Sequence, residues 1–224
     1  MESLEEIKAR VEAAVPGAKI EIVPNAAVPA QTSLLLDREH AVAIAKFLRD
    51  DPVLQLDHCS NVTGVDWLDR KVTKKVKVKK VVEGVEKEIE EAQEEFFAGY
   101  LEAVYHLFSM SSKHGPVIIR MRTPDRATGA HLPSLISIWR SAEFQEREIF
   151  DLYGIKFDGH PDLRRILMWD EFEDFPMRKD YREPDDYEYE PTPHDEVLDK
   201  AKQHYPLRPQ LDGAEKITAT DSHG

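Results

Sequence analysis

Hydrophobic positions in the opening part of the chain recur at spacings that predict a helix, two strands and a second helix. Apolar residues stand three and four positions apart in residues 3–14, which predicts a short amphipathic helix. Short apolar runs at residues 20–23 and 33–36 predict two strands. The alanine-rich run at residues 40–50 has the composition of a helix that packs on a core.

The middle of the chain adds further strands to this pattern. Residues 53–68 hold two short apolar stretches, and the runs at 100–110 and 115–124 predict a strand pair. Pro133 suits the first turn of a short helix, because its missing N–H is not needed there. We therefore expect an α+β fold, with a single mixed α/β sheet domain over residues 1–168.

A further helix, after the short one at Pro133, is predicted for the sequence AEFQEREIFDLY at residues 142–153. Ser141 stands at its start as a capping residue, and Gly154 stands at its end, where a left-handed backbone is common. Within it, Glu143 with Arg147 and Arg147 with Asp151 have the spacing of ion pairs one helical turn apart. These pairs predict a helix whose charges neutralise one another.

A charged insertion at about residues 69–98 interrupts the predicted sheet. Its first half is basic and its second half is acidic, with a candidate turn at Glu83-Gly84. A hairpin-like insertion would set lysines opposite glutamates, whereas the alternative is a strand followed by a helix from about Glu86. The neighbouring glutamates would cancel the field that a nucleic-acid phosphate needs.

The C-terminal part of the chain is rich in acids and prolines. Residues 170–199 hold many more acids than bases, and several prolines follow residue 176. Such a composition does not favour a packed core. We expect residues 169–224 to form an extended acidic C-terminal tail that is ordered only against partners.

Charge and cysteine content narrow the possible functions. The net charge is −13 and the isoelectric point is near 5.2, which argues against nucleic-acid binding. Cys59 is the single cysteine, so the chain has no internal disulfide and cannot hold an iron–sulfur cluster alone. The first residues lack the features of a signal or transit peptide, and no apolar run is long enough to span a bilayer. We expect a bacterial cytoplasmic protein that reaches a membrane only through partners.

The stretch from Glu146 to Tyr181, EREIFDLYGIKFDGHPDLRRILMWDEFEDFPMRKDY, resembles the 30-kDa or C subunit of respiratory complex I, a family related to subunits of membrane-bound hydrogenases. Weaker matches precede it at residues 65–67, 104–109 and 132–135. Two departures are Asp174, where the family pattern has glycine, and the charged insertion. The signature and interface residues that the resemblance marks are Glu146, Arg147, Glu148, Asp151, Gly154, Gly159, His160, Pro161, Arg164, Arg165, Arg178, Lys179 and Asp180.

The resemblance implies a non-catalytic peripheral-arm subunit of a proton-translocating NADH:quinone oxidoreductase (complex I). Such a subunit docks beside the D (49-kDa-type) subunit, has the D and B subunits as its main partners, and supports electron transfer through assembly. It implies no cofactor in this chain, with FMN, iron–sulfur clusters, NADH and quinone held by other subunits. The implied location is the bacterial inner membrane, peripherally on the cytoplasmic side.

Two alternatives stay open at this point. The same kind of subunit occurs in a membrane-bound hydrogenase or in a quinone oxidoreductase with another electron donor. A free-standing metal-dependent hydrolase would instead use Glu146, Glu148, Asp151 and His160 as catalytic groups or ligands. No HExxH-type spacing supports that interpretation, and the adjacent His58 and Cys59 lack further partners in the sequence.

Overall fold

The computed structural model describes residues 2–25, 28, 31–82 and 85–182. Side chains are described for all of these residues except 74–93. Its elements are α1 (Leu4–Ala14), β1 (Ile20–Val23), β2 (Ser33–Leu36), α2 (Ala41–Asp50), β3 (His58–Trp67), β4 (Arg70–Val82), β5 (Val85–Phe97), β6 (Tyr100–Ser109), β7 (His114–Arg122), β8 (His131–Pro133), α3 (Ala142–Tyr153) and β9 (Lys156–Asp158). The predicted opening order of helix, strand, strand and helix is confirmed.

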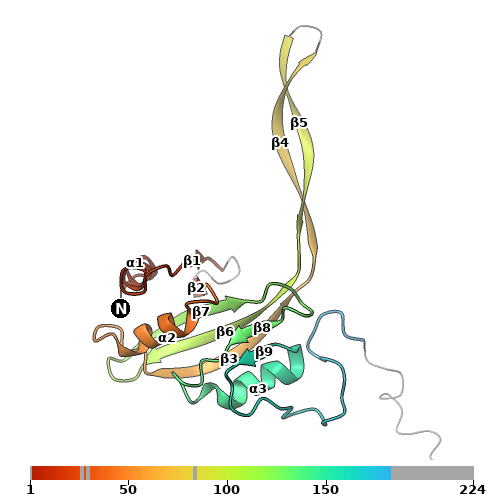
Figure 1. Ribbon diagram of the computed structural model, residues 1–224. Helices are drawn as coiled ribbons and strands as arrows, with labels where there is room; N and C mark the ends of the chain where they lie inside the picture. The colour runs from red at the N-terminus through yellow and green to blue at the C-terminus, as the bar shows by residue number, and fades with distance from the viewer. Residues whose placement is uncertain (1, 26–27, 29–30, 83–84, 183–224) are drawn as a thin grey trace, which may run out of the picture. The chain divides into compact units, whose positions relative to one another are not determined.

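The centre of the fold is a five-stranded mixed sheet in the order β1-β2-β7-β6-β3 (Figure 1). The β6–β7 pair is antiparallel, as the sequence predicts, and β3 pairs with β6 in the same way. Strand β2 runs parallel to β7, and this pair makes the sheet mixed. The predicted α+β class with a mixed sheet is therefore confirmed.

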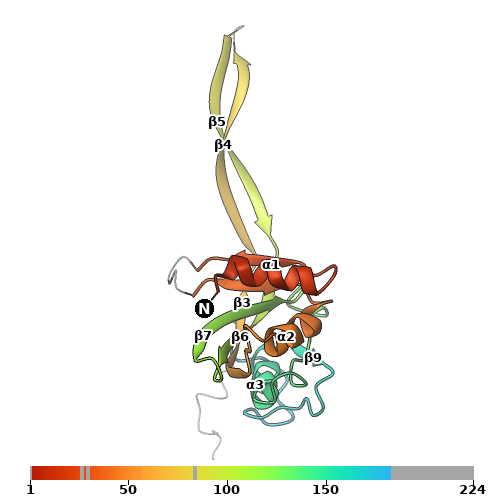
Figure 2. The same ribbon diagram turned by 90° about the vertical axis from the view of Figure 1, so that its left-hand side faces the viewer.

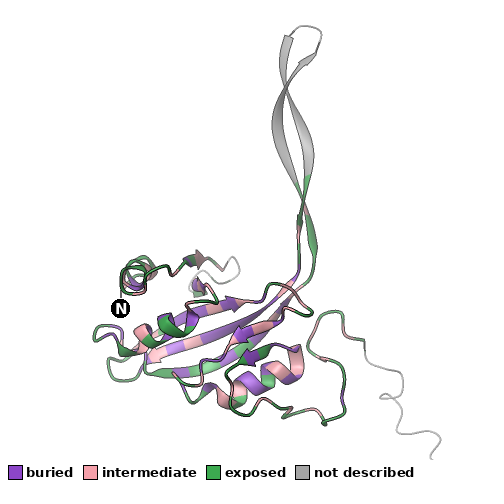
Figure 3. Cartoon of the chain, viewed as in Figure 1, coloured by how far each residue is buried: buried purple, intermediate pink, exposed green. Residues whose placement is uncertain are grey.

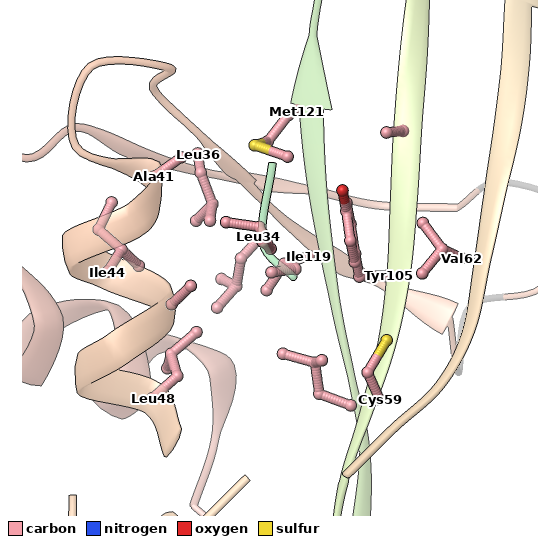
Figure 4. Packing of buried hydrophobic residues seen from close by; sticks show 14 of the residues in the cluster. Leu34, Leu36, Ala41, Ile44, Leu48, Cys59, Val62, Tyr105, Ile119 and Met121 are labelled. Carbon is pink, nitrogen blue, oxygen red and sulfur yellow. The ribbon is translucent and has the colours of Figure 1, made fainter. Parts of the chain in front are cut away.

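The hydrophobic core lies between the helices and one face of the sheet. The apolar stripe of α1 buries Ile7 and Val11, and α2 buries Ile44 and Leu48. Figure 4 shows the α2 residues pointing toward Leu34 and its sheet neighbours. Burial of each such side chain contributes about 1.5–3 kcal/mol to the free energy of unfolding.

The other face of the sheet carries no described helix. Figure 2 shows α2 and α3 on one side of β7, β6 and β3. Because side chains alternate along a strand, Leu101 and Tyr105 of β6 enter the core, whereas Glu102 and His106 lie on the opposite face. We call this second face the bare face.

Helix α3 approaches β3 closely because one strand residue has no side chain. A Cβ atom on Gly64 would stand 2.5 Å from Cδ2 of Tyr153, so only glycine allows this contact. The helix ends as predicted, at Gly154 with φ of 75°. Ser141 stands before the helix, but its hydroxyl donates to the carbonyl of Cys59 at 2.7 Å and makes no cap hydrogen bond.

The predicted short helix at Pro133 is wrong. Pro133 ends strand β8, where it lies opposite Asp158 of β9 in a parallel pair. The residues between β8 and α3 form turns instead of a helix. Proline in a strand is tolerated here because β8 and β9 form a sheet of only two strands, in which a proline nitrogen can face away from the partner.

The charged insertion forms the predicted hairpin-like structure of β4 and β5, and the alternative helix from Glu86 is wrong. The Cα register sets Lys77 opposite Glu90 and Lys79 opposite Glu88. The turn expected at Glu83-Gly84 lies outside the described residues. We call β4 and β5 the ribbon.

The ribbon continues the pairing of two sheet strands without a shift. Asp66 of β3 lies opposite Leu101 of β6, and Arg70 of β4 lies opposite Phe97 of β5. Between these two pairs both strands advance by the same number of residues. The ribbon is therefore an in-register extension of the β3–β6 hairpin.

The chain divides into two units, Met1–Tyr181 and Arg182–Gly224. Residues 169–181 of the expected tail belong to the first unit, and residues 183–224 lie outside the described residues. Among the helices that the structure describes, none is both long and apolar enough to cross a membrane.

The contact between Gly64 and Tyr153 gives a test of how α3 is held. Gly64→Ala should lower the free energy of unfolding by about 1–3 kcal/mol, because the new methyl group would force α3 away from β3. Urea unfolding of the purified chain measures this loss. Thr63→Ala, an exposed change on the same strand, is the control, and equal losses in both variants would contradict the close packing.

Candidate functional site

The signature stretch folds back over the helix in which it begins. After β9, residues 159–181 run along α3, and we call this segment the strap. The amide of Met177 donates to the carbonyl of Leu152 at 3.1 Å, and Arg178 Nε donates to the carbonyl of Tyr153 at 2.7 Å. Gly154 lies against Phe175 and Arg178, so the end of α3 and the strap pack together.

Asp151 holds the first half of the strap. Its side chain is fully buried, and Oδ2 accepts hydrogen bonds from the consecutive amides of Ile166, Leu167 and Met168 at 2.7–3.0 Å. Oδ1 accepts from Arg165 Nη1 at 2.6 Å. Burial would raise the pKa of Asp151, but the Met168 amide, the Arg165 guanidinium and the other two amides outweigh it and lower the pKa.

Arg165 is an internal residue of the strap. Its guanidinium also donates to the carbonyls of Asp151 and Asp174, and it lies 5.5 Å from the ring centres of Phe172 and Phe175. Asp174 needs no glycine, because its backbone lacks the positive φ that glycine favours. The departure from the family pattern therefore leaves this turn intact.

Asp66 and Asp180 hold the second half of the strap through one arginine. Arg126 donates to both oxygens of Asp66, at 2.7 and 2.8 Å, and to both oxygens of Asp180, at 3.0 and 2.7 Å. The amide of Lys179 also donates to Asp66 at 2.8 Å, and its ammonium lies over the ring of Trp67. The weak family match at residues 65–67 and the end of the signature at residues 178–180 are thus in contact.

Glu146 ties α3 to the loop before it. Its buried carboxylate accepts hydrogen bonds from the Tyr105 hydroxyl at 3.0 Å, the Ser134 hydroxyl at 2.5 Å and the Leu135 amide at 2.9 Å. Burial raises the pKa of Glu146, although these three donors oppose the rise. The carboxylate is therefore a structural acceptor with its partners in place.

The expected ion pairs within α3 are wrong. Arg147 donates to the strap carbonyls of Arg164 and Arg165 at 3.2 and 3.1 Å and lies 3.7 Å from Asp162. Its helix neighbours pair elsewhere, Glu143 with the preceding turn and Asp151 with Arg165. The helix charges therefore hold the strap in place.

The turn that opens the strap is built around His160. Its Nε2 lies 3.0 Å from the carbonyl of Glu143, and its Nδ1 accepts from the Asp162 amide at 3.1 Å. Gly159 before it has φ of 84°, and Pro161 after it is exposed. Arg164 is paired with Asp162 at 3.0 Å but stays 70% exposed, so it, and not Arg165, can meet a partner.

The proposed metal constellation does not form. Glu148 is exposed, whereas Glu146 and Asp151 are buried in separate networks with their own donors. Within the described ranges, no three His, Cys, Asp or Glu side chains gather so that they could hold a metal ion. Cys59 is buried, and burial raises the pKa of its thiol to about 12.

The outer surface of the strap combines exposed apolar side chains with exposed charged ones, Arg164, Asp170, Glu171 and Glu173 among them. Its exposed side chains include Ile166, Leu167, Trp169 and Met177, and Leu167 is 61% exposed. Figure 3 shows exposed positions along this segment, which runs beside α3. Exposed apolar residues on a rigidly held loop are typical of a protein–protein interface.

Sequence reasoning missed three residues that hold the strap and helix. Arg126 lies in a turn after β7, and Tyr105 and Ser134 lie on β6 and after β8. Each acts across a long distance in sequence. Arg126 is the only charged residue of the three, and it lies in none of the family matches. Tyr105 and Ser134 lie in the weak family matches at residues 104–109 and 132–135, which is the only sign in the sequence that they matter.

The fold and the strap define a class of protein, an α+β module with a braced loop that carries exposed apolar side chains. A chain in the structure of the membrane-bound sulfane sulfur reductase, an archaeal respiratory membrane complex, shares this fold. It matches with a TM-score of 0.51 and 18% identity, covering 96% of this chain and 98% of that chain.

The family model described as "Respiratory-chain NADH dehydrogenase, 30 Kd subunit" matches residues 34–187. The chain therefore belongs to this family, and the predicted resemblance is confirmed.

Curated relatives carry the corresponding name. The NADH-quinone oxidoreductase C subunit of Roseiflexus castenholzii is 33% identical over 78% of this chain and 81% of its own length. The second C-type subunit of Rhizobium meliloti is 36% identical over 64% of this chain and 62% of its own. The C subunit of Saccharopolyspora erythraea is 34% identical over 67% of this chain and 49% of its own. The chain thus spans about half to three-fifths of the length of several relatives.

The buried Asp151 gives a test of the strap. Asp151→Asn should lower the free energy of unfolding at neutral pH by about 3–5 kcal/mol, because Arg165 would be left buried without its partner. The pKa of Asp151 is lowered in the folded state, so its stabilisation is present above the unfolded value of about 3.9 and is lost as pH falls through the folded value. The gap between native and variant chains should therefore shrink toward acid pH.

Urea unfolding at neutral and at acid pH measures this gap. Asp162→Asn is the matched control, since Asp162 also pairs with a strap arginine but is half exposed, and its loss should be much smaller. Equal losses in the two variants would show that the strap is not held by Asp151.

Glu146 should show the opposite pH dependence. Its pKa is raised in the folded state, so the native chain loses stability as pH rises from the unfolded value of about 4.3 to the folded value. Glu146→Gln has no proton to release, and its stability relative to the native chain should improve over this window. Unfolding curves at several pH values within this window measure the difference in stability between the two chains, and the exposed Glu148→Gln is the control. A stability of Glu146→Gln that falls relative to the native chain as pH rises would contradict the prediction.

Proposed function

We propose that this chain is a non-catalytic peripheral-arm subunit of a proton-translocating NADH:quinone oxidoreductase, and that its strap docks on a partner subunit. The observation that carries the proposal is the group of exposed apolar side chains, Leu167 foremost, on a strap that is fixed from beneath by Asp151, Arg165 and Arg126. Membership of the 30 Kd subunit family supports the same interpretation.

The D (49-kDa-type) subunit is the proposed partner of the strap, with the B subunit nearby. Interface centres favour aromatic side chains, methionine and arginine, and the strap offers Trp169, Met177 and the exposed Arg164. Fixing the strap before binding also reduces the entropy lost on association. This combination suits a lasting contact within a complex.

In this proposal the chain supports electron transfer by assembly alone. The buried carboxylates that could serve as acids, bases or ligands, Glu146 and Asp151 among them, are already met by donors of the chain. FMN, iron–sulfur clusters, NADH and quinone would be held by other subunits. The chain would reach the inner membrane through those subunits, on the cytoplasmic side.

A quinone oxidoreductase or hydrogenase with another electron donor is the second candidate. The fold shared with a chain of the sulfane sulfur reductase favours neither donor, because it is a likeness of fold alone. The names of the sequence relatives favour NADH. Purification through a tag on this chain separates the two, since NADH- and FMN-binding subunits should copurify only in the first case.

The strap proposal predicts that one exposed leucine matters for assembly. Leu167→Gln should reduce the amount of complex recovered through a tag on this chain, because it places an amide at the centre of an apolar contact. Met110→Gln is the matched control, since Met110 is 66% exposed and lies after β6, outside the strap. Thermal unfolding of both variant chains checks that each still folds.

Two results would contradict the proposal. The first is a full yield of complex with Leu167→Gln. The second is recovery of the native tagged chain alone from membranes that contain the intact complex.

A further inference from the structure

The bare face of the sheet carries a charged and aromatic surface where the ribbon begins. Glu102 of β6 is fully buried there, although no described helix covers this face. It accepts hydrogen bonds from Trp67 Nε1 at 2.7 Å, Arg122 Nε at 2.6 Å and Arg120 Nη1 at 3.3 Å. Two arginines therefore share a single buried carboxylate.

Aromatic rings hold the cations of this surface in place. Arg122 lies 4.9 Å from the ring centre of Tyr100, and Tyr100 lies 6.2 Å from Trp67. Arg70, the first residue of the ribbon, lies 5.0 Å from the ring of Phe97 and is exposed. We call Trp67, Arg70, Tyr100, Arg120 and Arg122 the Tyr100 patch.

The positive charges of the patch reach solvent, whereas its negative charge is buried. Glu102 has no exposed surface, whereas Arg122 is 32% exposed and Arg70 is open to solvent. Burial raises the pKa of Tyr100, and the charged groups acting on its hydroxyl are Glu102, Arg122, Arg70 and Arg120. The phenol therefore stays a hydrogen-bond donor at neutral pH, beside Glu102 and three arginines, and the Lys179 ammonium lies 5.4 Å from the ring centre of Trp67 in the same patch.

One donor of the patch lacks an acceptor. Among the described residues, Arg120 Nε is buried without any hydrogen-bond partner. His106 is a neighbour on the same face, and burial, with Arg120 second, lowers its pKa. A buried N–H of a guanidinium without an acceptor costs free energy, and a carboxylate that enters between Arg120 and the side chains that cover it would remove that cost.

We propose that the Tyr100 patch is a second docking surface, which binds an acidic segment of a partner protein and pairs its carboxylates with Arg122, Arg120 and Arg70. The apolar part of the surface consists of Trp67 and the Tyr100 ring. Arginine and aromatic side chains together are the residues most enriched at interface centres.

The charge of the whole chain favours a protein segment over a nucleic acid. With a net charge of −13, the chain repels a long polyphosphate, and counterion release from a patch with three arginines is too small to overcome this. A short acidic segment of a protein needs only a local match. The strap meets the patch at one point, where Lys179 lies over the ring of Trp67, but the arginines of the patch lie on β4 and β7, so the proposal goes beyond the function proposed above.

Peptide binding by the purified full chain tests the patch. The probe is a short fluorescein-labelled peptide of alternating glutamate and leucine, and fluorescence anisotropy measures its affinity at low and at physiological salt. Arg122→Gln and Arg70→Gln should each weaken binding about three- to tenfold. Arg70 does not contact Glu102, so its variant keeps the buried carboxylate in its native pairing.

Arg49→Gln is the matched control for charge and exposure. Arg49 is 32% exposed, as Arg122 is, and pairs with Asp50 on α2. Its variant should bind the probe as tightly as the native chain. Unchanged affinity in both patch variants, an equal loss in Arg49→Gln, or tighter binding of an RNA oligonucleotide through the same arginines would each overturn the proposal.

A cross-linking experiment on the purified complex tests the same contact in its native setting. Arg122→Lys introduces an amine that a zero-length carbodiimide can join to a neighbouring carboxylate. Mass spectrometry should find the product on an acidic residue of another subunit, and the control Arg49→Lys should give none. A product on Glu102 alone would overturn the proposal, whereas failure of the tagged chain to recover any other subunit would instead refute the proposed function.

Discussion

The structure depends on the requirement that a carboxylate removed from water must receive hydrogen bonds from the protein. Asp151 meets it with three consecutive amides and one guanidinium, all from the strap. An acceptor at the centre of three successive N–H groups forces that backbone to curve around it. The curved backbone leaves Leu167 directed outward, so the same contact that satisfies the buried charge exposes the apolar surface.

The same device recurs at other places in the fold. Asp66 joins the end of β3 to the strap through Arg126, Glu146 joins α3 to the loop after β8, and Glu102 joins β3 to β6 and β7. Each carboxylate connects segments that are far apart in sequence. Together they give the signature residues a shared role in positioning backbone, which explains why a string of acids, arginines and histidine resembles an active site.

The helices and strands could be predicted because their periods are local. The partners of the charged residues could not, because spacing shows only which side chains are able to meet. Glu143, Arg147 and Asp151 have ideal spacing for pairs along α3, yet burial of Asp151 favours Arg165, which can bring three amides with it. Pro133 misled for a similar reason, since its fixed φ suits a helix start and a strand end equally well.

Buried ion pairs add little stability compared with apolar residues of the same volume, but an arrangement that leaves one partner buried and unpaired is strongly disfavoured. This balance fits a strap whose apolar residues must stay outside the core. If hydrophobic contacts alone held residues 159–181, Leu167 and Trp169 would bury themselves against α3 in the free chain. Because Asp151 accepts hydrogen bonds from the strap amides and Arg126 joins Asp66 to Asp180, the strap backbone is held where Leu167 and Met177 stay exposed.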